Sequence, residues 1–81
     1  MDRTPSELDW SLMQAFLAVA ETGSLTGAAR SLDRSQPTLG RQIKTLESQL
    51  GAELFHRQPR GFALTQTGAE LVAPARAMRD A

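Results

Sequence analysis

Cysteine is absent from this chain of 81 residues, and histidine occurs only once. Without cysteine the chain can form neither a disulfide nor a thiolate nucleophile, and the usual structural zinc ligands are missing as well. His56, which has no second histidine to join it, is interpreted as a residue of a β-hairpin and not as a metal ligand. We therefore expect no metal and no cofactor, and a fold stabilised by packing alone.

Long apolar runs are absent too. No run approaches the roughly 20 residues that a membrane-spanning helix needs. The first ten residues, MDRTPSELDW, lack the apolar stretch of a secretory signal. Hydrophobic residues make up 41% of the chain and charged residues 22%, which is typical of one small globular domain. We expect a cytoplasmic protein with no membrane partner.

The chain also has no excess of charge of either sign, since its formal net charge is zero. A neutral chain argues against nucleic-acid binding, because such domains are usually basic. The charge is nevertheless unevenly distributed. Residues 1–33 carry two basic and five acidic side chains, whereas residues 34–60 carry five basic and two acidic ones. The basic central segment is therefore consistent with nucleic-acid binding despite the zero net charge of the chain.

Three helices are predicted in the first 51 residues. The first is expected to begin after Asp9 and to end at Gly23, and the second to run from its cap Ser24 to Leu32. After a turn at residues 33–34, Ser35 is expected to cap a third helix over residues 36–50. At 100° per residue, this helix has an apolar side of Leu39, Ile43, Leu46 and Leu50 and an opposite side of Pro37, Arg41, Lys44 and Ser48.

A hairpin and a fourth helix are predicted to follow. Residues 54–57 and 61–64 are β-capable and flank residues 58–60 as a hairpin tip, and Thr65 is a candidate cap for a helix over residues 65–81. Pro74 is expected to bend that helix modestly. The predicted fold class is mainly α, with three helices, a two-stranded hairpin and a long C-terminal helix. No catalytic constellation is found, so the chain is not expected to be an enzyme.

The second and third helices, joined by a short turn, have the lengths of a helix-turn-helix, although the periodicity fits an ordinary helical hairpin equally well. The run SQPTLGRQIKTLE at residues 35–47, with LG at 50–51 and LFHR at 54–57, closely resembles the DNA-binding domain of LysR-type transcriptional regulators. The similarity extends to GSLT at 23–26, Ala28, Ala29, Leu64, Thr65 and Gly68, and covers nearly the whole chain beyond the first eight residues.

This resemblance implies a winged helix-turn-helix over residues 1–64 and a linker and dimerisation helix over residues 65–81. It further implies a cytoplasmic transcription regulator that binds double-stranded DNA sequence-specifically, as a dimer on an interrupted palindrome. Helix 36–50 would enter the major groove, and the wing would meet the backbone or minor groove. The alternative function is a winged-helix module that binds protein, for which the zero net charge is the main argument.

The family also implies an effector-binding domain after the linker helix. We therefore expect the chain to be the DNA-binding fragment of a longer regulator. A small-molecule inducer would bind only the domain missing here, and a higher oligomer is possible for the full-length protein.

The candidate DNA contacts lie on the third helix and the wing: Ser35, Gln36, Pro37, Thr38, Gly40, Arg41, Lys44, Arg57 and Arg60. The Gln36 amide can pair with an adenine edge, and Arg41 can bind guanine or phosphate. Lys44 is expected at phosphate or in solvent. For each of these the alternative is a solvated side chain, and Arg57 could instead hold the wing through a carboxylate.

Two positions depart from the family pattern. Gly40 replaces a usual serine, and Arg34 replaces a usual aliphatic residue, so that Arg34 is either buried or directed to phosphate. The last helix has an apolar side formed by Leu71, Val72, Ala75 and Met78, part of which is expected to remain open for a homodimer. The resemblance to the family implies that the two copies of this helix pair antiparallel. Packing of this side on its own domain is the alternative.

Overall fold

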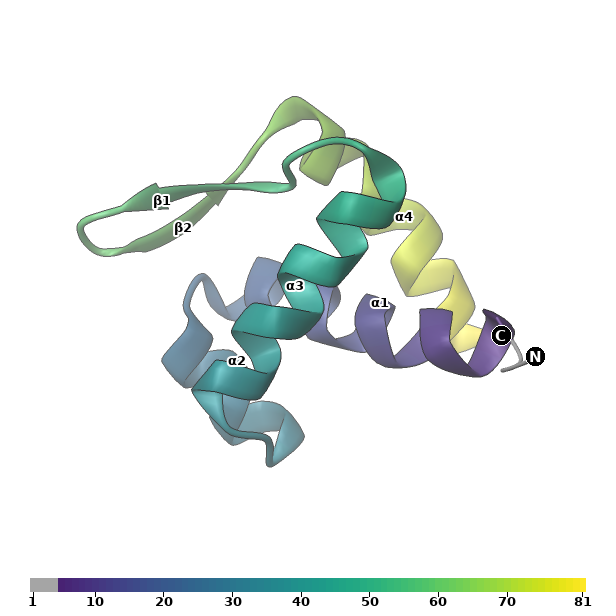
Figure 1. The fold of residues 1–81 in the computed structure, drawn as a ribbon, viewed down its shortest axis with the longest axis horizontal. Helices are drawn as coiled ribbons and strands as arrows, with labels where there is room; N and C mark the ends of the chain where they lie inside the picture. Colours follow the sequence, from purple (N-terminus) through teal and green to yellow (C-terminus); the bar gives the residue numbers. More distant parts are fainter. Residues whose placement is uncertain (1–4) are drawn as a thin grey trace.

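The computed structural model describes the backbone of residues 5–81 and the side chains of residues 10–81. In chain order its elements are α1 (Pro5–Thr22), α2 (Leu25–Leu32), α3 (Gln36–Leu50), β1 (Phe55–Gln58), β2 (Gly61–Leu64) and α4 (Gln66–Asp80). The β1–β2 hairpin and the C-terminal end of α4 lie at opposite ends of the long axis (Figure 1). The predicted order of elements is confirmed.

The predicted helix caps are confirmed where the structure describes them. The hydroxyl oxygens of Ser24, Ser35 and Thr65 accept hydrogen bonds from backbone N–H groups three residues later, at 2.9, 3.2 and 3.0 Å. Gly23 and Gly51 end α1 and α3 with φ of +80° and +69°, a backbone conformation that glycine adopts at little cost. Local sequence therefore determines most of the helix boundaries.

The start of α1 differs from the prediction. The helix begins at Pro5 and not after Asp9, so the expectation of a cap at Asp9 is wrong. Proline is favoured in the first turn of a helix, where its missing N–H has no intrahelical partner. The side chain of Asp9 lies outside the described residues.

The core is built around α1, whose Phe16 and Val19 are fully buried together with Leu39 of α3. Three aromatic rings extend it toward the hairpin: Phe16 and Phe55 have centroids 5.5 Å apart, and Phe55 and Phe62 have centroids 5.8 Å apart. Leu39, Ile43 and Leu46 form the predicted inner side of α3. This packing anchors α3 by one side only.

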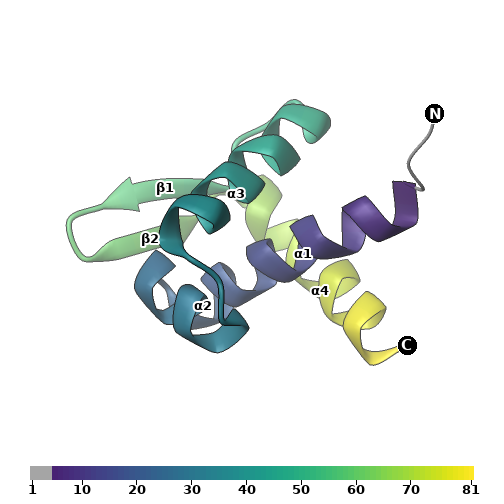
Figure 2. The ribbon, with the colours of Figure 1, turned by 60° about the horizontal axis from the view of Figure 1, so that its bottom comes forward.

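The expectation that Leu50 belongs to the buried side of α3 is wrong, since 48% of this residue is exposed. Its position around the helix lies between those of Leu39 and Ile43, but residues 48–51 are all exposed. The last turn of α3 projects beyond the other helices (Figure 2). Angular position alone therefore does not decide burial at the end of a helix.

The hairpin is a tight antiparallel pair whose register sets Phe55 opposite Leu64 and Gln58 opposite Gly61. The turn is therefore Pro59-Arg60, one residue shorter than predicted. Gly61 has φ +133°, and a Cβ at this position would collide with the carbonyl oxygen of Gly23. That oxygen accepts the Phe62 N–H at 3.0 Å, which attaches the hairpin to the turn between α1 and α2.

Helix α4 packs back along α1 (Figure 2). A Cβ at Gly68 would collide with the carbonyl oxygen of Leu54, so glycine permits the close approach of α4 to the start of the hairpin. The helix is continuous through Pro74. None of the described helices has the length and apolarity needed to cross a membrane.

Candidate nucleic-acid interface

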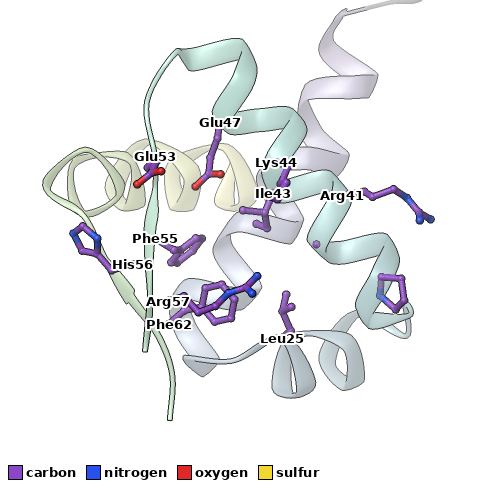
Figure 3. Close-up of a pocket in the computed structure, with 12 residues that line it drawn as sticks. Leu25, Arg41, Ile43, Lys44, Glu47, Glu53, Phe55, His56, Arg57 and Phe62 are labelled. Atoms are coloured by element: carbon purple, nitrogen blue, oxygen red, sulfur yellow. The ribbon is translucent and has the colours of Figure 1, made fainter. Parts of the chain in front are cut away.

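The outer side of α3 is a continuous polar surface. Pro37, Arg41 and Lys44 are exposed, as predicted from their angular positions, and Arg41 extends away from the body of the molecule (Figure 3). Gln36 is exposed as well, because it lies in the first turn of the helix, although its angular position is close to that of Ile43. Thr38 and Gly40 are half-buried. Because the inner side of α3 supplies its packing, this outer side is available to a partner.

The side chains of Ser35 and Thr38 already form hydrogen bonds within the first turn of α3. The Ser35 hydroxyl donates to the Thr38 hydroxyl at 2.8 Å and accepts from the Thr38 N–H at 3.2 Å. The Thr38 hydroxyl hydrogen is not used in this pair and can donate to a partner. At Gly40 an added Cβ would meet nothing within 4 Å, so the missing serine side chain would fit there.

A cleft of about 740 Å³ separates α3 from the hairpin (Figure 3). Apolar side chains line its inner part, namely Leu25, Ile43, Phe55 and Phe62, and the charged side chains around it are Arg41, Lys44, Glu47, Glu53 and Arg57. Three of the four basic candidate contact residues, Arg41, Lys44 and Arg57, therefore line one cleft. Arg60, at the tip of the hairpin, does not line it.

Arg57 lies across the hairpin from Phe62, with its guanidinium carbon 5.8 Å from the ring centroid. This distance is within the range of a cation–π interaction, which favours stacking of the guanidinium over the ring. Within the described part of the chain Arg57 forms no ion pair with a carboxylate. The alternative in which such a pair holds the wing is therefore not supported.

Glu47 has a role that the sequence analysis did not find. Its carboxylate accepts a hydrogen bond from the Leu54 N–H at 2.8 Å and so attaches the start of the hairpin to the last part of α3. The two residues are seven apart and lie in a helix and a loop, so no periodic pattern could have indicated the contact. The bond gives Glu47 a structural role within the cleft.

Arg34 turns inward, which settles a question that the sequence left open. Its guanidinium donates to Gln14 Oε1 at 2.7 Å, to Gln42 Oε1 at 3.2 Å and to the Ser11 carbonyl oxygen at 3.3 Å. The side chain is half-buried between α1 and α3. Of the two alternatives, burial is the one that the structure supports.

The basic side chains of α4 form ion pairs with a carboxylate, whereas in the described part of the chain those of α3 do not. Arg76 and Arg79 of α4 contact Glu21 at 3.3 and 3.2 Å, and the hydrogen bond with Glu21, followed by one with Asp80, raises the pKa of Arg79. Among the residues that the structure describes, Arg41 and Lys44 take part in no ion pair. Their charges are therefore available to a polyanion.

The predicted dimer side of α4 is only partly open. The expectation that Ala75 lies on an exposed stripe is wrong, because this residue is fully buried and its small side chain lets α4 approach the core. Leu71 and Val72 are half-buried against the same core. Met78, at 45% exposure, is the open member of the set.

The described residues contain no cluster of three or more His, Asp or Glu side chains that could hold a metal ion. The surface described above can instead present hydrogen-bond donors, acceptors and positive charge to a large polar partner.

Comparison with known sequences gives a consistent family. The family model for the bacterial regulatory helix-turn-helix proteins of the lysR family matches residues 10–69. The transcriptional regulator ClcR of Pseudomonas putida is 44% identical over 69 residues, covering 85% of this chain and 24% of ClcR. The regulator AbaB of Streptomyces antibioticus is 46% identical over 74 residues, covering 91% of this chain and 25% of AbaB. The chain thus spans about a quarter of the length of these relatives.

Solved structures agree with the sequences. A CbnR_DBD–DNA complex superimposes with a TM-score of 0.84 at 38% identity, covering 88% of this chain and 82% of that one. A BenM_DBD/catB site 1 DNA complex gives 0.84 at 35% identity, covering 88% and 80%. The predicted winged helix-turn-helix is thereby confirmed.

Proposed function

The chain belongs to the lysR family of bacterial regulatory helix-turn-helix proteins, and from that premise we propose that it binds double-stranded DNA sequence-specifically as part of a transcriptional regulator. The observation that carries the proposal is the outer side of α3, where Arg41 and Lys44 are exposed and form no ion pair within the described chain. The relatives named above are regulators and not enzymes.

The geometry suggests how each element contributes. The major groove of B-DNA, about 12 Å wide, admits one α-helix, and α3 has one free side along its whole length. Gln36 at the first turn offers an amide to adenine, and Arg41, five residues later, offers two parallel N–H donors to guanine. Lys44 and Arg57 line the cleft from its two sides, and Arg60 lies at the hairpin tip. In the proposed complex all three neutralise backbone phosphates.

Selection of duplexes from a randomised library by the purified chain, followed by titration over a salt series, tests the proposal. We expect an enriched sequence, and an affinity whose logarithm falls linearly with the logarithm of salt concentration by about 0.9 per phosphate neutralised. A scrambled duplex of equal length and composition is the control. If no sequence is enriched and duplex affinity stays at background, DNA binding is excluded, and a module that binds protein becomes the better interpretation.

We further propose that α4 contributes to an antiparallel homodimer, with Met78 at the contact and Leu71 and Val72 at its edge. The support is the exposure of Met78 on a helix that otherwise packs its apolar side on its own core. Two recognition helices related by a two-fold axis can meet successive major grooves about 34 Å apart. Ala75 has no part in this interface.

Met78→Glu is the informative variant, because Leu71 and Val72 also support the core and a charge there would disturb the fold. We expect a folded monomer that binds a full palindrome weakly and a half-site normally, as measured by sedimentation and titration. Ala73→Glu, exposed and about 140° away around the helix, is the matched control. A wild-type chain that remains monomeric on the full DNA site would exclude this interface.

A further inference from the structure

The guanidinium of Arg34 joins two helices that are not neighbours in sequence. One nitrogen, Nη2, donates to Gln14 of α1, and the other, Nη1, is shared between the Ser11 carbonyl oxygen of α1 and Gln42 of α3. Arg34 itself lies in the turn between α2 and α3. A single planar group thus spans α1, the turn and α3.

The Arg34 contact constrains the rotation of α3 about its own axis, which burial of apolar side chains does not. Leu39 and Ile43 hold α3 on α1 by burial, which is non-directional and tolerates some rotation of the helix. Hydrogen bonds from a guanidinium are directional, and its donors lie in a fixed plane. Because Gln42 directly follows Arg41, a bond at Gln42 constrains the rotation that determines where Arg41 points.

Small rotations matter at a base-reading surface. A turn of about 20° moves the outer surface of a helix, some 5–6 Å from its axis, by about 2 Å. Hydrogen bonds to a base edge require donor–acceptor distances of about 2.7–3.2 Å, so a displacement of this size breaks them. The orientation of α3 is therefore part of the DNA-binding surface.

We propose that Arg34 is a positioning residue that fixes the orientation of α3 on α1, and through it the direction of Gln36 and Arg41. Arg34 acts through Gln14 and Gln42 and touches no DNA. Its effect on base discrimination rests on the proposed function, whereas its effect on helix orientation does not.

The first experiment uses no DNA. Since the chain lacks cysteine, Ser48→Cys and Ala73→Cys introduce the only thiols, one on α3 and one on α4, which packs against α1. Spin labels at these exposed positions report the distance between the helices by electron–electron double resonance. We expect a narrow distribution for the otherwise wild-type chain and a broadened or shifted one for Arg34→Leu.

The same substitution at Arg30, an exposed arginine on α2, is the matched control and should leave the distribution narrow. Gln42→Leu removes only the acceptor on α3 and should broaden the distance distribution as Arg34→Leu does. It tests the same contact if Arg34→Leu folds poorly. Arg34→Lys should give a distribution of intermediate width. Its ammonium group still donates hydrogen bonds but lacks the planar fork of the guanidinium. An unchanged distribution in both Arg34→Leu and Gln42→Leu would overturn the proposal.

The second experiment uses the duplex selected by the wild-type chain and its scrambled counterpart. We expect Arg34→Leu to reduce the ratio of the two affinities about tenfold, comparable to the loss of one bidentate base contact. The salt slope, meaning the fall in the logarithm of affinity per logarithmic unit of salt concentration, should stay unchanged. A salt slope lower by about one would identify Arg34 as a phosphate contact and overturn the positioning role. If the wild-type chain selects no duplex, the proposed function fails, and the label distances still decide the role of Arg34.

Discussion

Helices α3 and α4 are both 15 residues long, and both begin with a hydroxyl cap that accepts a bond from the third residue, yet they use their surfaces in opposite ways. The first buries three large side chains on one side and leaves its positive charges exposed. The second buries only Gly68 and Ala75 among its residues, and its Arg76 and Arg79 bind Glu21. One helix presents charge outward, whereas the other uses charge to stay attached to α1.

The difference teaches that exposure and charge do not by themselves mark a binding residue. Arg41 and Arg76 are both exposed arginines in helices of equal length, but only Arg76 has a carboxylate partner among the described residues. A phosphate competes for a guanidinium more easily when no internal carboxylate must first be displaced. The pairing within the chain therefore separates the candidate DNA surface from the structural one.

The largest expected effect concerns the buried side of α3. Leu39→Ala should lower the free energy of unfolding by about 2–5 kcal/mol, because it leaves a cavity in a fully packed site. Leu50→Ala, on the same helix but half exposed, should cost no more than about 1 kcal/mol. Urea denaturation of the two variants measures the contrast, and equal losses would show that the last turn of α3 is packed after all.

Glycine is required in α4 but not in α3. Gly68→Ala should destabilise the fold by about 1–3 kcal/mol, because its new methyl group meets the Leu54 carbonyl oxygen. Gly40→Ala should stabilise it by about 0.5–1 kcal/mol, since the site is open and alanine is the better helix former. Opposite shifts in thermal midpoint are the expected outcome, and shifts of the same sign would refute the assignment.

The two arginines should differ in DNA binding. Arg41→Ala should weaken binding to the selected duplex by about 1–3 kcal/mol while the fold stays intact, because a bidentate contact is lost. Arg76→Ala should leave the discrimination between selected and scrambled duplexes unchanged. Fluorescence anisotropy with both duplexes checks this, and an equal loss in both variants would remove the distinction between the surfaces.

The hairpin tip should contribute without reading sequence. Arg60→Ala should weaken the selected and scrambled duplexes by the same factor and reduce the salt slope by about one, the signature of a phosphate contact. Titrations at several salt concentrations provide the test. A loss confined to the selected duplex would mean that the wing reads bases.

The smallest effect is expected at the ion pairs of α4. Glu21→Gln should lower the thermal midpoint slightly at low salt and not at about 1 M salt, where the Debye length is about 3 Å. A guanidinium is charged well above neutral pH, and hydrogen bonds with Glu21 and Asp80 raise the pKa of Arg79 further, so its contribution is lost only as pH rises through that raised value. Raising the pH from 7 to 9 should therefore not change the Glu21→Gln difference, which thermal denaturation at both pH values would check.

Local features of the sequence were enough to determine most of the fold. Ser24, Ser35 and Thr65 satisfy backbone groups within three residues, and Gly23 and Gly51 end helices by their own conformational freedom. The outer side of α3 was likewise predictable, because the period of a helix assigns Arg41 and Lys44 to the side opposite Leu39 and Ile43. The candidate binding residues on the outer side of α3 therefore follow from the sequence alone.

Contacts between distant residues were decided only by tertiary structure. The exposure of Leu50 depends on how far α3 projects past its neighbours, and the burial of Ala75 on how closely α4 approaches the core. The bonds from Arg34 to Gln14 and from Leu54 to Glu47 join positions 20 and 7 residues apart, across different elements. Periodicity describes one helix about its own axis, whereas these contacts depend on the relative placement of elements, and that placement exists only once the whole core has packed.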